Sequence, residues 1–378
     1  MSKGGERGSE RGKRFFTAPA VGESSRRFYS SARIFKPELF PNSVLKVLAG
    51  GFLVADIVVA DLERIASPGE LVYAPRGIVL SVGGHPANVS VDLAKLGVQP
   101  DSVGVCGAVG NDFFGDFIIK TLEGYGLKLF IERVPASTNK NVILVVKGED
   151  RRFHVELGAS NLLKPETLVQ LAERERPEVF YLASGITDLV DARIGEVFER
   201  AARVSRITFS DSVQPHGKSW SYILPAFPYI AVFHCNESEA KGLTGAADLE
   251  GALRRLLSWG VKLALVTMGE RGAVAANKRW VVGQPAFKVE VVDPTGAGDA
   301  FCAGVIWRLL ELGFSASELS EASGEELAAL LLYGQAAGAS ACTAPGTTEG
   351  VSRSKVEELV EGQGRSLLRV TKIRSLSR

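Results

Sequence analysis

The stretch VVDPTGAGDAF, residues 291–301, is the most informative part of this 378-residue sequence. It follows an apolar segment, 287–292, which we expect to be a strand, and it precedes a helical pattern that ends at Gly313. A Gly-Ala-Gly turn at the start of a helix lets free backbone N–H groups come close to a ligand. The stretch therefore predicts a site, between a strand and a helix, for a phosphate or for the charge that develops on a phosphoryl group.

An acidic residue, Asp299, falls in the first turn of the expected helix, beside this anion site. A carboxylate is a poor ligand for an anion, but it can act as a base that takes the proton from an attacking hydroxyl group. The structural alternative is an acidic residue that complements the helix dipole, which is common at helix N-termini. Because Asp299 comes directly after the Gly-Ala-Gly turn, we interpret it as a catalytic base.

A second motif, GGHPAN at residues 83–88, precedes another expected helix. Pro86 suits the first turn of that helix and Gly97 suits its end. The paired glycines allow a small ligand to approach the backbone, and the Asn88 amide can both donate to and accept from a hydroxyl group. Taken alone, a Gly-Gly turn with a capping asparagine is more often structural. His85 could contact a substrate, or its side chain could be satisfied by the helix backbone.

Apolar strand patterns alternate with amphipathic helical patterns from Val44 onward. This alternation predicts a mostly parallel central sheet with helices on both faces, an α/β/α fold of three layers. The expected strands are residues 47–50, 179–182, 207–210, 230–233 and 263–267. The expected helices include residues 165–174, 191–204 and 249–259.

Two segments interrupt this alternation, because they are rich in Val, Ile and Phe but have no helix between their strands. The strands expected at 141–146 and 152–156 flank a tight turn and form a hairpin. We interpret both segments as a small β-sheet that projects from the main domain and closes over a ligand as a lid. The residues assigned to the lid are 64–84 and 129–159.

The composition is that of a globular protein, with 46% hydrophobic and 23% charged residues, and the formal net charge is +1. The charge is uneven: residues 1–44 hold nine Lys or Arg against four Glu, and residues 361–378 hold five against one. The part between them is acidic, so its charge does not indicate a nucleic-acid partner. The uncharged stretch 327–348 is too rich in small and polar residues for a membrane span.

These features predict one main domain, residues 45–360, between two basic tails. We expect residues 1–44 to be disordered, with an organelle transit peptide as the alternative, and residues 361–378 to be a solvated end. The four cysteines form no Cys-x-x-Cys pair, which predicts buried reduced thiols. We expect the protein to be cytoplasmic.

Both motifs, in this order, resemble the two signatures of the ribokinase (PfkB-type) carbohydrate kinase family. The resemblance extends from about Val47 to Gly346. It implies a ribokinase-like fold with a β lid, and transfer of the ATP γ-phosphoryl group to a hydroxyl group of a small molecule. Further matching positions are Gly50-Gly51 with Asp56, Gly110-Asn111-Asp112 with Gly115, Asn236 with Glu239, and the segment 267–272.

The resemblance also implies the roles of particular residues. Asp299 would be the base, and the backbone N–H groups of Gly296, Ala297 and Gly298, which we call the anion hole, would stabilise the transferred charge. The other implied contacts are Asp56, Gly83, Gly84 and Asn88 for the acceptor; Asn236, Glu239, Thr267, Gly269, Gly272 and Gln335 for ATP and Mg²⁺; and Asp293, Thr295 and Gly346 for a monovalent cation such as K⁺.

Departures from the family pattern bear on the substrate. Val54 stands where ribokinases proper have Asn, which argues against ribose. The segment 211–215 keeps an Asp but lacks the Asn and Arg common in fructokinases and ketodeoxygluconate kinases, which argues against sugar acids. The segment 86–88 is closer to fructokinase-like members. We therefore expect a small sugar or sugar derivative as acceptor, with a nucleoside as the alternative, since a nucleoside would use the same ribose contacts.

Members of this family often dimerise through their lids, so we expect a homodimer. A non-catalytic relative that binds a sugar or a nucleotide is the rival from another class, and the intact Asp299 and anion hole argue against it. His154, His216 and His234 show no metal-ligand spacing, and we interpret them as surface or core residues.

Overall fold

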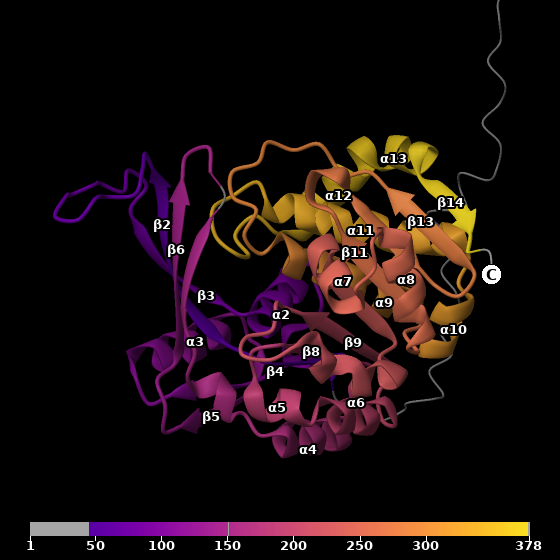
Figure 1. Ribbon diagram of the computed structural model, residues 1–378, viewed down its shortest axis with the longest axis horizontal. Helices are drawn as coiled ribbons and strands as arrows, with labels where there is room; N and C mark the ends of the chain where they lie inside the picture. Colours follow the sequence, from indigo (N-terminus) through magenta and orange to yellow (C-terminus); the bar gives the residue numbers. More distant parts are fainter. Residues whose placement is uncertain (1–44, 150, 377–378) are drawn as a thin grey trace, which may run out of the picture. The chain divides into compact units, whose positions relative to one another are not determined.

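The computed structural model describes residues 45–149 and 151–376 (Figure 1). The expected disordered tail at residues 1–44 lies outside the described residues. Among those that are described, no helix combines the length and the apolar character that crossing a membrane requires.

The main sheet has ten strands in the order β14-β13-β12-β11-β10-β9-β8-β1-β4-β5. The seven strands from β11 to β5 in this order run parallel, and the three at the other edge are antiparallel. Their bounds are β1 Val47–Gly50, β4 Val103–Gly110, β5 Lys128–Val134, β8 Val179–Ser184, β9 Ile207–Ser212, β10 Val232–Asn236, β11 Leu263–Thr267, β12 Ala273–Ala276, β13 Trp280–Gln284 and β14 Lys372–Ser375.

Helices cover both faces of this sheet, so the three-layer α/β/α prediction is confirmed (Figure 1). Successive side chains of a strand point to opposite faces, and in β1 Val47 and Ala49 join one core while Leu48 joins the other. One layer contains α2 His85–Lys95, α3 Phe113–Gly124, α9 Ala297–Leu312, α10 Ala316–Glu321, α11 Gly324–Ala341, α12 Arg353–Leu359 and α13 Arg365–Val370. The other contains α4 Pro165–Glu175, α5 Asp188–Ala192, α6 Ile194–Ala202, α7 Glu237–Thr244 and α8 Leu249–Ser258.

Most of the expected core strands and helices are confirmed, with two corrections. The helix expected at 191–204 is two shorter helices, α5 and α6. The segment 287–292 is not a strand, although it is apolar. Val291 and Val292 there are 61% and 40% exposed, so no sheet neighbour buries them.

A second sheet of four strands, in the order β3-β2-β6-β7, stands beside the main sheet (Figure 1). We call these four strands and their connections the lid. The expected hairpin is confirmed, since β6 and β7 pair antiparallel. The strand bounds are β2 Val54–Leu62, β3 Ile78–Gly83, β6 Asn139–Val146 and β7 Arg152–Glu156.

The expected lid boundaries need two corrections. The lid begins earlier than residue 64, because β2 is one of its two inner strands and follows β1 after only three residues, 51–53. Residues 129–134 lie in β5, which pairs in parallel with β4 at the edge of the main sheet. Their apolar side chains belong to the main domain rather than to a separate lid sheet.

The prediction that residues 361–378 form a solvated basic tail is wrong for the described part, which ends at residue 376. Helix α13 buries Leu367 against the core, and β14 pairs antiparallel with β13. All four residues of β14 are exposed. Charged and short strands are typical of sheet edges, where they discourage pairing with another chain.

The thiols are free, as expected. Cys106, Cys235 and Cys302 are buried and Cys342 is partly buried.

Candidate active site

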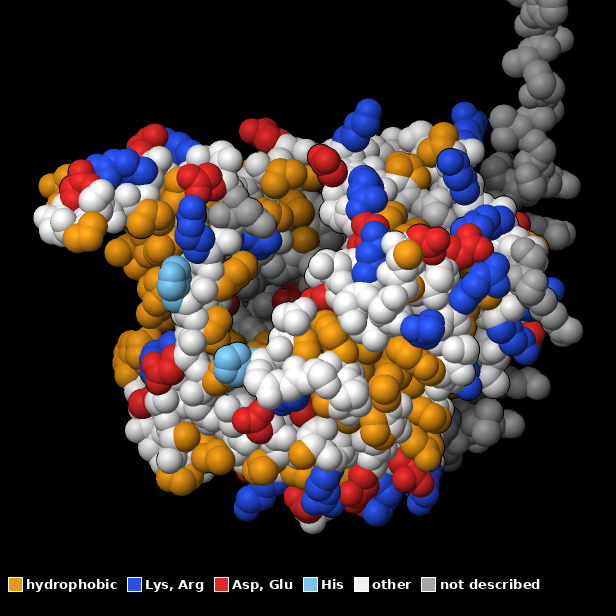
Figure 2. Space-filling model, viewed as in Figure 1, with side chains coloured by type: hydrophobic (Ala, Val, Ile, Leu, Met, Phe, Trp, Pro, Cys, Tyr) orange, Lys and Arg blue, Asp and Glu red, His pale blue; other side chains and the backbone are white. Residues whose placement is uncertain are grey.

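The sequence motifs meet where the parallel strands of the main sheet end. Asp211, His234 and Thr267 lie at or near the carboxyl ends of β9, β10 and β11. Open α/β sheets bind ligands at this edge. Figure 2 shows a hollow between the lid and the main domain, with acidic side chains at its floor.

The centre of the site is Asp299, which is 7% exposed in the first turn of α9. The amide Nδ2 of Asn88, from the start of α2, donates a 2.8 Å hydrogen bond to its Oδ2. The two sequence motifs are therefore in direct contact. Gly296 precedes α9 with φ 78°, and a Cβ on it would lie 2.0 Å from the carbonyl oxygen of Thr347. Only glycine fits this turn, so the close backbone approach that defines the anion hole depends on it.

Asp56, from the lid strand β2, is buried and accepts a 3.1 Å hydrogen bond from Nδ2 of Asn141 on β6. A Cβ on Gly83 would lie 1.8 Å from Oδ2 of Asp56, so this carboxylate occupies the space that the missing side chain leaves. The neighbouring Gly84 has φ 90° and leaves no room for a Cβ against the carbonyl oxygen of Phe52. The two glycines therefore let the base of the lid pack onto the start of α2.

A chain of charged and polar groups continues from Asp299 into the main domain. His85 Nδ1 lies 3.5 Å from Asp299 Oδ1 and 3.2 Å from Asp211 Oδ2. His234 Nδ1 lies 2.8 Å from Asp211 Oδ1, and its Nε2 lies 3.2 Å from the hydroxyl of Thr267. Because a carboxylate only accepts hydrogen bonds, His234 carries a proton on Nδ1.

The protonation of these groups follows from burial and from their neighbours. Burial raises the pKa of Asp299, and the nearby His85 opposes this rise. Burial also disfavours the charged form of Asp211, but His234 and His85 hold the pKa of Asp211 well below its usual range. Burial raises the pKa of Asp56 to about 7, although the hydrogen bond from Asn141 lowers it. Asp211 is thus the fixed negative charge at the centre of this row of charged and polar side chains.

The residues predicted to organise ATP and Mg²⁺ follow β10 and β11. Asn236 caps α7: its Oδ1 accepts from the backbone N–H of Glu239 at 2.9 Å, and Glu239 Oε2 accepts from the Asn236 N–H at 2.8 Å. This capping box gives both residues a structural role. Glu239 remains within the electrostatic reach of Asp211, His234 and His85. Thr267 ends β11, and Gly269 and Gly272 form the turn that follows it.

Gln335, predicted to lie near adenine, is buried on α11. Its Nε2 donates a 2.8 Å hydrogen bond to Oε1 of Gln284, the last residue of β13.

The three residues predicted to bind a monovalent cation lie together. Asp293 Oδ1 accepts from the N–H of Thr295 at 2.9 Å and from its hydroxyl at 2.6 Å, and Asp293 Oδ2 accepts from the N–H of Gly346 at 3.1 Å. Arg151, beside the lid strand β7, donates from Nη1 to the Thr295 hydroxyl at 2.9 Å. The lid hairpin therefore touches the loop that leads into the anion hole.

Sequence reasoning missed the roles of His234 and Arg151 and left His85 open. His234 is buried, as one of the two expected alternatives held, but it lies in the site rather than in an inert core. The signal that could have found it is the strand pattern, because Asp211 and His234 both fall near the carboxyl ends of neighbouring parallel strands. No local pattern could place Arg151, because it depends on how the lid hairpin folds over the main domain.

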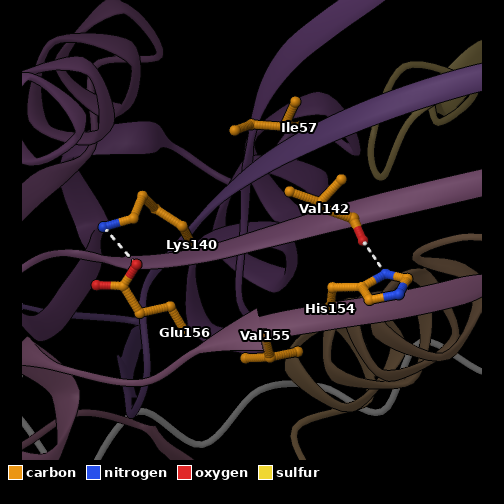
Figure 3. Close-up of a pocket in the computed structure, with 6 residues that line it drawn as sticks. All are labelled: Ile57, Lys140, Val142, His154, Val155 and Glu156. Carbon is orange, nitrogen blue, oxygen red and sulfur yellow. Dashed lines mark hydrogen bonds and ion pairs between the residues drawn. The ribbon is translucent and has the colours of Figure 1, made fainter. Parts of the chain in front are cut away.

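A separate shallow hollow lies on the lid itself (Figure 3). Ile57 lines it, and Ile57 follows Asp56 along β2, so the hollow is on the lid face opposite to Asp56. Lys140 and Glu156 form an ion pair there at 2.9 Å. The hollow is lined by Ile57, Lys140, Val142, His154, Val155 and Glu156. It is therefore separate from the residues around Asp299.

Comparisons with known proteins identify the family. Residues 49–354 match the model of the pfkB family carbohydrate kinases, so the chain belongs to this family. It is 31% identical to a fructokinase of Klebsiella pneumoniae over 281 residues, which are 70% of this chain and 86% of that protein. It is 26% identical to an ATP-dependent 6-phosphofructokinase of Thermoanaerobacterium thermosaccharolyticum over 261 residues, 62% of this chain and 77% of that protein. The crystal structure of a ribokinase from Thermotoga maritima superposes with a TM-score of 0.68 at 27% identity, over 84% of this chain and 100% of that one. The protein is accordingly a kinase with a hydroxyl group as phosphoryl acceptor.

Proposed function

We propose that this protein transfers the γ-phosphoryl group of ATP to a hydroxyl group of a small sugar or sugar derivative. The observation that carries the proposal is the position of Asp299. This buried carboxylate accepts a hydrogen bond from Asn88, and it lies in the first turn of α9, directly after the glycine turn of the anion hole. The acceptor side and the phosphate side of the reaction thus meet at one carboxylate.

In the proposed reaction Asp299 takes the proton from the acceptor hydroxyl. The acceptor oxygen forms a bond to the γ-phosphorus, and the bond from that phosphorus to the oxygen bridging the β- and γ-phosphates breaks, so ADP leaves. The N–H groups of Gly296, Ala297 and Gly298 stabilise the charge on the transferred group, and one such donor is worth about 3 kcal/mol of transition-state stabilisation. A positioned base contributes about 10²–10⁴-fold.

The acceptor is proposed to bind between the lid and α2. Asp56 and Asn88 would hold its hydroxyl groups, and Gly83 and Gly84 would let it lie against the backbone. The names of the two curated relatives, a fructokinase and a 6-phosphofructokinase, support a sugar as the acceptor. A nucleoside remains the alternative that the experiment below tests, because Asp56 and Asn88 would serve a ribose equally.

ATP is proposed to lie along the ends of β10 and β11, near Asn236, Thr267, Gly269 and Gly272, with Gln335 near adenine. Glu239 uses only Oε2 in its capping box, so Oε1 is available among the described residues to hold water around Mg²⁺. When bound, Mg²⁺ would supply charge neutralisation of the phosphates. A cytoplasmic location suits a reaction that consumes ATP.

A monovalent cation such as K⁺ is proposed beside the anion hole. Asp293 and Thr295 offer carboxylate and hydroxyl oxygens, which are ligands that hard cations prefer, and the cation would compete with the guanidinium of Arg151 for the Thr295 hydroxyl. Activity should then rise with K⁺ at constant ionic strength.

The protein is also proposed to form a homodimer through its lid. The lid exposes apolar side chains whose burial would favour association, and Leu71, Tyr73 and Ile78 are 71%, 81% and 67% exposed. Sedimentation at micromolar concentration tests this, and a monomer would overturn it.

The activity is tested by ADP release with ATP, Mg²⁺ and K⁺ over a panel of sugars, sugar acids, polyols and nucleosides. We expect turnover that depends on a sugar and that Asp299→Asn lowers by about 10²-fold or more. Equal rates for the two proteins would overturn the role of Asp299. Preference for nucleosides would replace the sugar assignment, and no ADP release with any acceptor would favour a binding protein instead.

A further inference from the structure

The imidazole of His85 lies between two buried carboxylates from different parts of the fold. Its Nδ1 is 3.2 Å from Asp211 Oδ2 on β9 and 3.5 Å from Asp299 Oδ1 on α9. The two acids are 2% and 7% exposed. Two negative charges this close in the interior repel each other strongly unless a positive charge lies between them.

Asp211 is held rigidly, so it can fix the position of His85. Its Oδ2 accepts a 2.9 Å hydrogen bond from the hydroxyl of Tyr181, and its Oδ1 accepts from His234. His234 is itself packed against the first turns of α9, with its ring 5.2 Å from that of Phe301. The carboxylate of Asp211 is therefore anchored to strands β8 and β10 before it meets His85.

The ring of His85 is also packed. Its centroid is 5.0 Å from that of Phe52, in the link between β1 and the lid, and its side chain is 23% exposed. The charged groups around it come from several elements: Asp299 on α9, Asp211 on β9, Glu239 on α7, and, beyond Asp211, His234 on β10. Burial alone would lower the pKa of His85, but Asp299 and Asp211 raise it to about 10.

We propose that His85 is a positioning residue for phosphoryl transfer: held by Asp211 as an imidazolium, it keeps the carboxylate of Asp299 charged and correctly placed. This inference rests on the proposed function. Asp211 and His85 then act together: Asp211 fixes the imidazolium of His85, and this imidazolium lies beside Asp299. His85 would also oppose the effect of burial on Asp299, since burial alone favours the neutral form of that carboxyl group.

The first test compares the pH dependence of kcat at saturating acceptor, which excludes changes in acceptor affinity, in the wild type, His85→Gln and His85→Lys, with His216→Gln as control because the side chain of His216 is exposed. Without the cation, the pKa of Asp299 rises further, so the acidic limb for His85→Gln moves to higher pH by about one unit or more, with a loss of about tenfold or more at pH 6. His85→Lys returns the limb toward its wild-type position. A loss of rate in His85→Gln with an unmoved acidic limb would overturn the proposal, because a merely structural role gives that result.

The second test needs no turnover. Imidazole NMR signals of the intact protein are followed from pH 5 to pH 10, with the His85→Gln variant assigning the His85 signal. We expect His85 to stay protonated beyond pH 8, above the ordinary imidazole value of about 6.5. A neutral His85 at pH 7 would overturn the proposal. If no acceptor in the panel supports ADP release, the proposed function fails, and this titration still decides whether His85 is the cation.

Discussion

The side chains of Asn88 and Asp299, 211 positions apart in sequence, are joined by a 2.8 Å hydrogen bond in which the amide donates to Oδ2. The bond leaves Oδ1 of Asp299 facing His85. One oxygen of the proposed base is thus oriented by the acceptor-side motif and the other by the charged chain that ends at Thr267. The carboxylate has one defined orientation, which proton transfer requires.

Removing this hydrogen bond should weaken catalysis in a specific way. Asn88→Ala removes a donor that lowers the pKa of Asp299, and it removes a proposed contact with the acceptor. We expect kcat/KM for the acceptor to fall by about tenfold or more, while KM for ATP changes little. Steady-state kinetics with each substrate varied in turn measure this. An equal rise in both KM values would contradict a role confined to the acceptor side.

The space at Gly83 gives a second prediction. An added Cβ would lie 1.8 Å from Oδ2 of Asp56, so Gly83→Ala must displace that carboxylate. We expect KM for the acceptor to rise by about tenfold with a smaller change in KM for ATP. The matched control is Gly124→Ala at the end of α3, where no atom lies within 4 Å of the added Cβ. Unchanged acceptor kinetics in Gly83→Ala would show that Asp56 does not bind the acceptor.

The contact between the lid hairpin and the loop that leads into the anion hole gives a third prediction. Arg151→Met removes the 2.9 Å hydrogen bond to Thr295 and should lower kcat/KM by about tenfold, because the closed lid is less stable. Arg152→Met is the control: Arg152 is the next residue, is exposed and pairs with Glu149 within the hairpin. Equal effects of the two substitutions would mean that the loss comes from the hairpin rather than from its contact with the main domain.

The acceptor affinity should depend on pH through Asp56. Burial raises the pKa of Asp56 to about 7, so the side chain changes from neutral to charged as the pH rises through this value. A charged carboxylate accepts stronger hydrogen bonds from hydroxyl groups. We expect KM for the acceptor to fall between pH 6 and pH 8, and Asp56→Asn to abolish that change.

The same shift affects folding stability with a definite sign. The folded state holds the Asp56 proton more tightly than the unfolded chain, whose Asp pKa is about 4, so this group destabilises the fold as the pH rises from about 4 to about 7. Chemical denaturation at pH 5 and pH 8 should show a smaller decrease in unfolding free energy for Asp56→Asn than for the wild type. The opposite order would contradict the raised pKa.

The parts of the fold that are local in sequence could be predicted from it. The helices that begin at His85 and Ala297 were predictable because their glycine turns and apolar periodicity lie within a single segment. Strand β14 was not, because Lys372–Ser375 is short, exposed and mostly polar, and only its pairing with β13 makes it a strand. The segment 287–292 shows the reverse: its strand-like apolar pattern finds no sheet neighbour.

The candidate site also has one part that is local in sequence and one part that depends on distant contacts. Asp299, Asn88 and the anion hole are carried by two motifs, each readable by itself. The row of side chains from His85 through Asp211 to His234 joins three elements, α2, β9 and β10, and although His85 lies within the second motif, nothing in that motif indicates its contact with Asp211. Such contacts depend on the order of strands in the sheet, which single-sequence patterns do not contain.

The three-residue link between β1 and β2 has a consequence for the order of events in turnover. Asp56 is the third residue of β2, close to this link, whereas Arg151 lies in the turn between β6 and β7, and β6 reaches this turn beside the far end of β2. If the lid swings on residues 51–53, displacement grows with distance from the pivot, so Arg151 travels far while Asp56 scarcely moves. The base of the lid, which holds Asp56, can then contact the acceptor before the hairpin tip closes onto the loop that leads into the anion hole. We expect acceptor binding to precede closure, with a fluorophore at the hairpin tip responding later than acceptor capture in stopped-flow traces.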